Sequence, residues 1–116
     1  MSAVAVDPLD PDTVFAGTAK GGVFRTTNGG AMWAPVNEGL TELTMTAIVI
    51  DPSDPATLFV GTDGGGVFRS TDGGDTWAPF NNGLTIWRVT DLAINPSGSK
   101  LHASTDGGGV FDVTLG

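Results

Sequence analysis

The sequence repeats itself with a period of 44 residues, and this period limits the folds that the chain can adopt. Three segments of the unit recur at corresponding positions: residues 3–8, 47–52 and 91–96; 14–18, 58–62 and 101–105; and 22–25, 66–69 and 109–112. The last step is one residue shorter, at the loop 97–99. Self-similarity at such a spacing indicates an architecture that stacks one supersecondary unit several times.

Each unit consists of short β-rich runs separated by clusters of Gly, Pro, Asn and Asp, which are turn signals. No stretch has apolar residues at a 3.6-residue spacing, so the sequence predicts an all-β fold. The expected strands number eleven and lie near residues 3–7, 13–17, 22–26, 32–36, 45–50, 57–61, 66–70, 76–80, 88–94, 100–104 and 109–113. The 18 Gly and 7 Pro residues of the 116-residue chain supply the turns between them.

Four antiparallel strands in each repeat of this length are typical of a β-propeller blade. We therefore predict an all-β fold of four-stranded propeller blades, with about 2.75 blades in the chain. Blade 1 is expected at residues 1–40, blade 2 at 41–84 and an incomplete blade 3 at 85–116. A β-sandwich with a similar number of strands is the alternative, but it gives no reason for the period.

One turn of the second unit carries a specific motif. Residues 70–77 match the pattern S-x-D-x-G-x-x-W and resemble the Asp-box of the BNR repeat family. Residues 26–33 keep the same shape, with Thr in place of Ser and Asn in place of Asp. We call residues 26–33 the first box and residues 70–77 the second box.

The segments beside the boxes look most like the branch of photosystem II assembly factors and sortilin-type receptors. The resemblance covers essentially the whole chain and implies a β-propeller. It leaves the function open, because the family also contains sialidases and xyloglucan-degrading glycosidases.

The box residues are expected to be structural. An Asp or Asn side chain can accept hydrogen bonds from turn N–H groups, a Gly permits a positive φ, and a Trp can pack against the turn between blades. The residues expected in this role are Thr26, Asn28, Gly30, Trp33, Ser70, Asp72, Gly74 and Trp77. The resemblance implies that these turns lie opposite the usual ligand site.

Composition excludes several functions. Lys and Arg number 5 against 13 Asp and Glu, a net charge of −8, so we expect no binding to nucleic acid or to anionic membranes. The absence of Cys excludes disulfide frameworks and thiolate sites. No apolar run is long enough to span a membrane, and residues 1–7 show no signal-peptide pattern. The family resemblance implies an extracytoplasmic or cell-surface location.

The residues also argue against catalysis. A sialidase needs a Tyr nucleophile and an arginine cluster, but the chain has no Tyr, and its only arginines are Arg25, Arg69 and Arg88. A glycosidase needs two carboxylates on opposite sides of one sugar. The carboxylates here recur at equivalent turn positions, as Asp63 and Asp106 do, which is typical of turn architecture. We therefore expect no catalytic residue and no enzyme activity, with a glycan-active enzyme as the alternative.

No metal or cofactor is expected either. Asp7, Asp10 and Asp12 could offer oxygens to Ca²⁺, but their loop lacks the Gly and the distal Glu of a calcium loop, which favours a solvated acidic turn. His102 stands where the other units have Phe, so we expect a packing residue. The Gly runs at 64–66 and 107–109 lie between strands and are interpreted as hairpin turns, since a phosphate loop opens a helix.

If a ligand site exists, topology places it at one rim. The turns between second and third strands share that rim with the connections between blades. The candidate binding residues there are Trp87, Arg88, Asp63, Asp106, Lys20 and Glu42. Trp87 and Arg88 break the repeat, because the first unit has Leu43 and Thr44 at these positions. An aromatic beside a cation can contact a protein or a sugar; alternatively, Trp87 fills a gap between blades.

An arc of fewer than three blades leaves two large sheet faces uncovered, since closed propellers usually have four to eight blades. We expect two copies to associate head to tail into a six-bladed ring. An open filament built by the same contact, or a place within a longer propeller, are the alternatives. The expected function is a non-catalytic scaffold or binding module that recognises a protein or a glycan.

Overall fold

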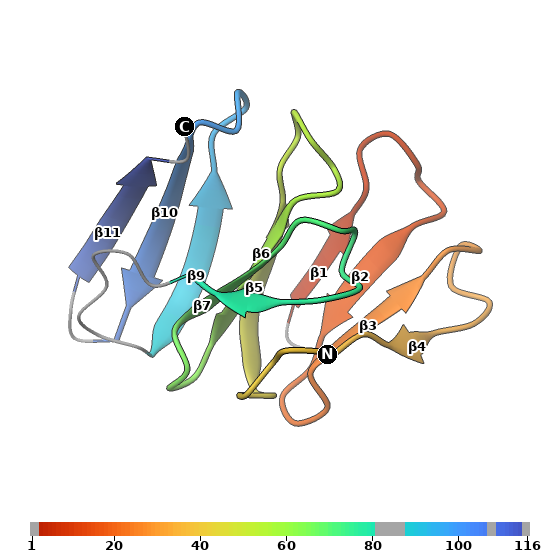
Figure 1. Ribbon diagram of the computed structural model, residues 1–116, viewed down its shortest axis with the longest axis horizontal. Helices are drawn as coiled ribbons and strands as arrows, with labels where there is room; N and C mark the ends of the chain where they lie inside the picture. The colour runs from red at the N-terminus through yellow and green to blue at the C-terminus, as the bar shows by residue number, and fades with distance from the viewer. Residues whose placement is uncertain (1–2, 81–87, 107–108, 115–116) are drawn as a thin grey trace.

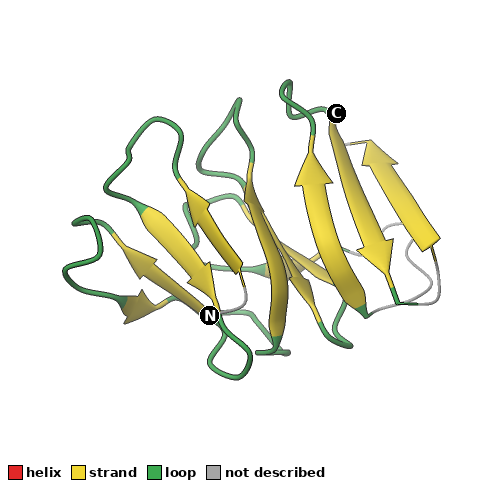
Figure 2. Cartoon of the chain, turned by 180° about the vertical axis from the view of Figure 1, so that it is seen from behind, coloured by secondary structure: helices red, strands yellow, loops and turns green. Residues whose placement is uncertain are grey.

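A computed structural model describes residues 3–80, 88–106 and 109–114. This part of the chain is built of strands and loops (Figure 2). The strands are β1 (Ala3–Val6), β2 (Val14–Gly17), β3 (Val23–Thr26), β4 (Ala34–Pro35), β5 (Met45–Ile50), β6 (Leu58–Thr62), β7 (Val67–Ser70), β8 (Ala78–Pro79), β9 (Val89–Ile94), β10 (Lys100–Thr105) and β11 (Gly109–Thr114). No helix in the described ranges has the length and apolar character needed to cross a membrane.

The strands form three antiparallel sheets that stand side by side in chain order (Figure 1). The first sheet has the order β1-β2-β3-β4 and the second β5-β6-β7-β8. The third sheet consists, in the described residues, of β9, β10 and β11 with β10 in the middle. The predicted all-β propeller fold is confirmed, with each sheet paired as the strands of one blade.

The outermost strands β4 and β8 are only two residues long, and each has a proline opposite a third-strand phenylalanine: Pro35 pairs with Phe24 and Pro79 with Phe68. A proline is tolerated on such an edge strand where its nitrogen faces away from the neighbouring strand. The ladder bonds continue at the next residue. Val36 donates its backbone N–H to the Val23 carbonyl at 2.8 Å, and Phe80 donates to the Val67 carbonyl at 2.7 Å.

A threonine and a glycine close the turn between the second and third strands of each sheet. The hydroxyls of Thr18, Thr62 and Thr105 donate to the carbonyls of Gly22, Gly66 and Gly109. The three glycines have φ values of 75°, 78° and 81°, a region that favours glycine. These contacts explain why a Gly recurs at this point of every unit.

Two apolar layers join the sheets, because alternate residues of each strand point to opposite faces. Between the first and second sheets, Phe15 and Val23 pack against Leu58 and Phe68. Between the second and third sheets, a separate cluster contains Phe59, Val67, Leu92, Leu101 and Ala103. The second sheet is therefore covered on both faces, whereas the first and third sheets each have one outer face.

Candidate functional site

The predicted rim exists as a set of backbone contacts between turns and connections. In the connection that leads into β5, the Leu43 carbonyl accepts from the Gly22 N–H and the Thr44 carbonyl accepts from the Asp63 N–H, at 3.0 and 3.1 Å. At the next connection, Arg88 forms a β-bridge with Asp63, and its carbonyl accepts from the Asp106 N–H at 3.0 Å. Each connection is thus held between the turns of two successive sheets.

Arg88, Asp63 and Asp106 lie together at this rim. The Nε of Arg88 donates to Oδ1 of Asp63 at 2.7 Å, and its Nη1 lies 3.4 Å from Oδ2 of Asp106. All three side chains are exposed to solvent. The hydrogen bond to Asp63, followed by the charges of Asp63 and Asp106, raises the pKa of Arg88 above its usual value. One guanidinium thereby links equivalent turns of the second and third sheets.

The other rim candidates are not part of this ion-pair cluster. Lys20 is exposed on the corresponding turn of the first sheet. Glu42 accepts the backbone N–H of Thr44 at 3.1 Å, and its Cβ lies against Gly65, so it shapes the connection. Trp87 lies outside the described residues.

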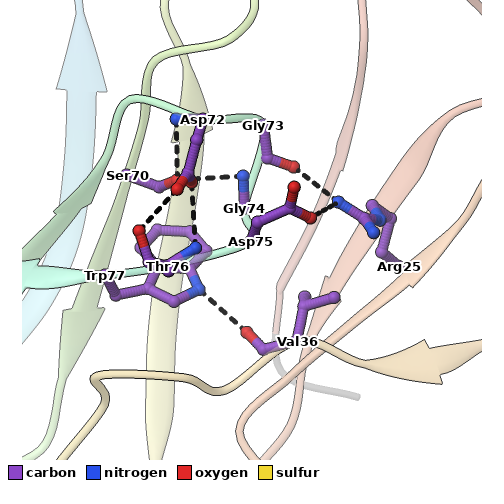
Figure 3. A network of polar contacts seen from close by, with 9 residues as sticks. All are labelled: Arg25, Val36, Ser70, Asp72, Gly73, Gly74, Asp75, Thr76 and Trp77. Atoms are coloured by element: carbon purple, nitrogen blue, oxygen red, sulfur yellow. Dashed lines mark hydrogen bonds and ion pairs between the residues drawn. The ribbon is translucent and has the colours of Figure 1, made fainter.

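The second box is a closed hydrogen-bonded turn (Figure 3). The Ser70 hydroxyl donates to Oδ1 of Asp72 at 2.8 Å and accepts from the Gly74 N–H at 2.9 Å. Oδ1 of Asp72 also accepts from the Thr76 N–H at 2.9 Å, and Oδ2 accepts from the Thr76 hydroxyl. These bonds lower the pKa of Asp72 to about 2, with the Thr76 hydroxyl making the largest contribution.

The second box also forms hydrogen bonds and an ion pair with the first sheet (Figure 3). The indole N–H of Trp77, a buried residue, donates to the Val36 carbonyl at 2.8 Å. Nη1 of Arg25 donates to the Gly73 carbonyl at 2.9 Å and to Oδ1 of Asp75 at 2.8 Å. The box therefore fastens two sheets at the end opposite the rim.

The first box repeats the backbone N–H bonds of the second box but lies on an outer face. It lacks the hydroxyl bond that Thr76 makes, because Met32 stands at that position. The Thr26 hydroxyl accepts from the Gly30 N–H at 3.1 Å, and Oδ1 of Asn28 accepts from the Met32 N–H at 3.0 Å. Trp33, the equivalent of Trp77, is 40% exposed.

The acidic turns are held by their own hydrogen bonds. Asp7 accepts from the Leu9 N–H at 2.9 Å, and Asp10 accepts from the Asp12 N–H and the Thr13 hydroxyl at 3.2 and 2.9 Å. In the described ranges, no group of three or more His, Cys, Asp or Glu side chains is placed to hold a metal ion. The carboxylates of Asp7 and Asp10 thus act as turn acceptors.

His102 differs from the expected packing residue. Its side chain is 41% exposed, and Nδ1 lies 2.6 Å from Oδ1 of Asp112. Neither this pair nor the Arg25–Asp75 pair follows from motif spacing. The His102–Asp112 pair could have been found from the sequence as a departure from the repeat, because Asp112 stands where the other units have Arg25 and Arg69.

Comparisons with known proteins identify the fold. No family model and no curated protein matches the sequence. A GH74 xyloglucanase from Xanthomonas campestris is 22% identical, with a TM-score of 0.81 over 96% of this chain and 20% of that one. A GH74 enzyme from Niastella koreensis is 24% identical, with a TM-score of 0.80 over 96% of this chain and 19% of that one. YCF48 bound to D1 peptide is 15% identical, with a TM-score of 0.72 over 96% of this chain and 36% of that one.

The fold is that of a β-propeller. The chain spans about a fifth of the length of the two GH74 proteins. At these identities the likeness concerns the arrangement of strands, and the set includes both a xyloglucanase and a peptide-bound protein.

Proposed function

We propose that this chain is a non-catalytic segment of a β-propeller of the Asp-box type, with blades at residues 1–40, 41–84 and 85–116. Further sheets complete the propeller, and its rim recognises a protein or a glycan. The observation that carries the proposal is the ion-pair cluster of Arg88 with Asp63 and Asp106. The extracytoplasmic or cell-surface location implied by the resemblance is part of the same proposal.

The cluster favours a scaffold over a glycosidase. A glycosidase places an acid and a second carboxylate on two sides of one sugar. Asp63 and Asp106 instead lie on two sides of one guanidinium, which links neighbouring sheets. The guanidinium of Arg88 is positively charged across the ordinary pH range, and its two carboxylate partners raise its pKa further.

Recognition at the rim is supported by what the rim presents. The cluster, Lys20 and Glu42 place exposed or half-buried polar groups of both signs along one end of the chain. YCF48, which shares the fold, has been solved with a bound peptide. A polar rim of mixed charge suits an extended peptide segment with complementary charges better than a neutral sugar.

Turnover on xyloglucan tests the non-catalytic role. We expect the intact chain to release no reducing ends above the rate without protein. Asp63→Asn and Asp106→Asn should leave that background unchanged and keep the cooperative unfolding of the parent. Release of reducing ends that is lost in either variant, with folding retained, would make the chain a hydrolase and overturn the proposal.

A further inference from the structure

The outer face of the first sheet is apolar. We define the first-sheet outer face by the side chains that alternate with those packed on the second sheet: Val4, Val6, Val14, Ala16, Phe24 and Trp33. Val4 and Val6 are 56% and 52% exposed. None of these six residues carries a charge: Val4, Val6 and Trp33 are exposed, Val14 and Phe24 are half-buried, and Ala16 lies buried between its neighbours.

The repeat itself indicates what covers such a face. The equivalent residues of the second sheet are Ile48, Ile50, Leu58, Val60, Phe68 and Trp77. Leu58 and Phe68 are 0% and 1% exposed, because Phe15 and Val23 of the first sheet lie over them. The face of the third sheet toward the second is covered in the same way by Phe59 and Val67.

The outer face of the third sheet is different. We define the third-sheet outer face by Asp91, Ala93, His102, Ser104, Val110 and Asp112, which alternate with the residues packed on the second sheet. At the same positions the first sheet has Ala3, Ala5, Phe15, Gly17, Val23 and Arg25. Asp, His and Ser have thus replaced Ala, Phe and Gly on this face alone.

The polar groups of this face bond to one another. His102 pairs with Asp112 at 2.6 Å, and the Ser104 hydroxyl lies 2.9 Å from that of Thr90. A shallow depression of about 120 Å³ lies among Asp91, His102, Ser104 and Val110. Such a face suits water or polar groups and lacks the aromatic side chain that fills the junctions inside the chain.

We propose that the first-sheet outer face docks a propeller sheet whose facing side is apolar, as the facing sides of this chain's first and second sheets are. The third sheet of a second copy is not its occupant. This inference rests on the proposed function and specifies the partner that completes it. It also argues against the head-to-tail ring and the filament, which both require the third-sheet outer face as the partner.

Two physical reasons favour an apolar sheet over the third sheet of a second copy on the first-sheet outer face. Docking the third-sheet outer face on Val4 and Val6 would take the carboxylates of Asp91 and Asp112 out of water against an apolar surface, which is costly without new partners. An apolar sheet like the first carries no such cost. Its edge also presents a carbonyl at the Val36 position, where Trp33 can donate its indole N–H as Trp77 does.

A single thiol reports whether the face is covered, because the chain has no Cys. Val4→Cys places a thiol on the first-sheet outer face, and Val110→Cys places a matched control on the third-sheet outer face. The test variant repeats residues 1–44 ahead of the chain, so that a copy of the first sheet can lie over the original one. The period of 44 residues keeps the junction in register.

In this extended chain, we expect the thiol introduced by Val4→Cys in the original sheet to react with a disulfide reagent at least about ten-fold more slowly than in the parent, since the reagent reaches it only through local opening. The thiol introduced by Val110→Cys should react as in the parent. In a matched variant, the added sheet carries the third-sheet residues at Ala3→Asp, Phe15→His, Gly17→Ser and Arg25→Asp. The thiol at position 4 of the original sheet should then react as fast as in the parent chain.

Equal protection by both added sheets would overturn the inference, and so would no protection by either. Dilution of the unextended Val4→Cys chain gives an answer that does not depend on how the extended variants fold. We expect its reaction rate to be independent of protein concentration. Protection that rises with concentration would mean that a second copy occupies the face.

The outcomes also separate this inference from the proposed function. Hydrolysis of xyloglucan would overturn the proposed function whatever the thiol rates are. A concentration-dependent thiol rate in a chain without turnover would leave the non-catalytic role intact and would overturn only the choice of partner.

Discussion

The first and second boxes have the same length and share the hydrogen bonds from their backbone N–H groups, yet their surroundings differ. Thr26 and Ser70 are each 1% exposed and each accepts a backbone N–H from the glycine four residues later. Trp77 is 5% exposed under the first sheet, whereas Trp33 is 40% exposed on the outer face. The turn is therefore made by its own residues, while burial of its tryptophan depends on the neighbouring sheet.

Replacement of the two tryptophans should give the largest contrast. We expect Trp77→Ala to lower the free energy of unfolding by about 3–5 kcal/mol, because it empties a buried site and leaves the Val36 carbonyl without its donor. Trp33→Ala should cost about 1 kcal/mol or less, since the side chain is part-exposed. Urea denaturation in dilute solution measures both.

The intermediate variant Trp77→Phe separates packing from hydrogen bonding. It keeps most of the apolar surface and should cost about 1–3 kcal/mol, the usual penalty for an unpaired buried polar group. Equal losses for Trp77→Ala and Trp33→Ala would contradict the idea that the neighbouring sheet makes the difference.

The next largest difference in stability is expected between Ala substitutions at the central glycines of the two boxes. Gly30 and Gly74 have φ values of 98° and 94°, so Ala is strained at both, by about 1–2 kcal/mol. A Cβ on Gly74 would also lie 2.8 Å from the Phe15 ring, whereas a Cβ on Gly30 would meet only Trp33 at 3.9 Å.

We therefore expect Gly74→Ala to destabilise the chain more than Gly30→Ala, by about 1–3 kcal/mol of overpacking. Thermal unfolding of the two variants measures the difference. Phe15→Leu should restore part of the loss in the Gly74→Ala chain, because it removes the ring that the methyl meets. If both Ala variants lost the same stability, the contact of the new methyl group with Phe15 would not contribute to the free energy of unfolding.

The fold was predictable because the repeat and the turn residues carry it. Eleven strands were expected and eleven are present in the described residues, with the turns between second and third strands at the expected Gly runs. The fourth strands β4 and β8 are shorter than expected, at two residues each, and they lie at the outer edge of their sheets. The β-propensity of the short runs and the 44-residue period are therefore enough to predict the sheets.

The site was predictable only where topology decides it. Aligning the units placed Asp63, Asp106 and Arg88 at one rim, and they lie together there. The link from Arg25 to Asp75 joins residues from neighbouring sheets, and its existence depends on how closely those sheets pack. Alignment shows which residues are equivalent but not which ones meet across a junction.

The smallest expected effect is a pH dependence confined to the second box. The pKa of Asp72 is lowered from 3.8 to about 2 in the folded chain, whereas the first box has Asn28, which does not titrate. A carboxylate with a lowered folded-state pKa contributes stability above its unfolded pKa, and that contribution is lost as the pH falls through the folded value.

The melting temperature of the parent should therefore fall more than that of Asp72→Asn as the pH drops from about 4 to about 2. Asn keeps the acceptor for the Thr76 N–H, as Asn28 does for Met32, so the variant folds with the same turn. The other carboxylates titrate in both proteins and cancel in the difference. A gap in melting temperature that stays constant over this pH range would mean that the bonds from Thr76 and Ser70 do not favour the charged form of Asp72.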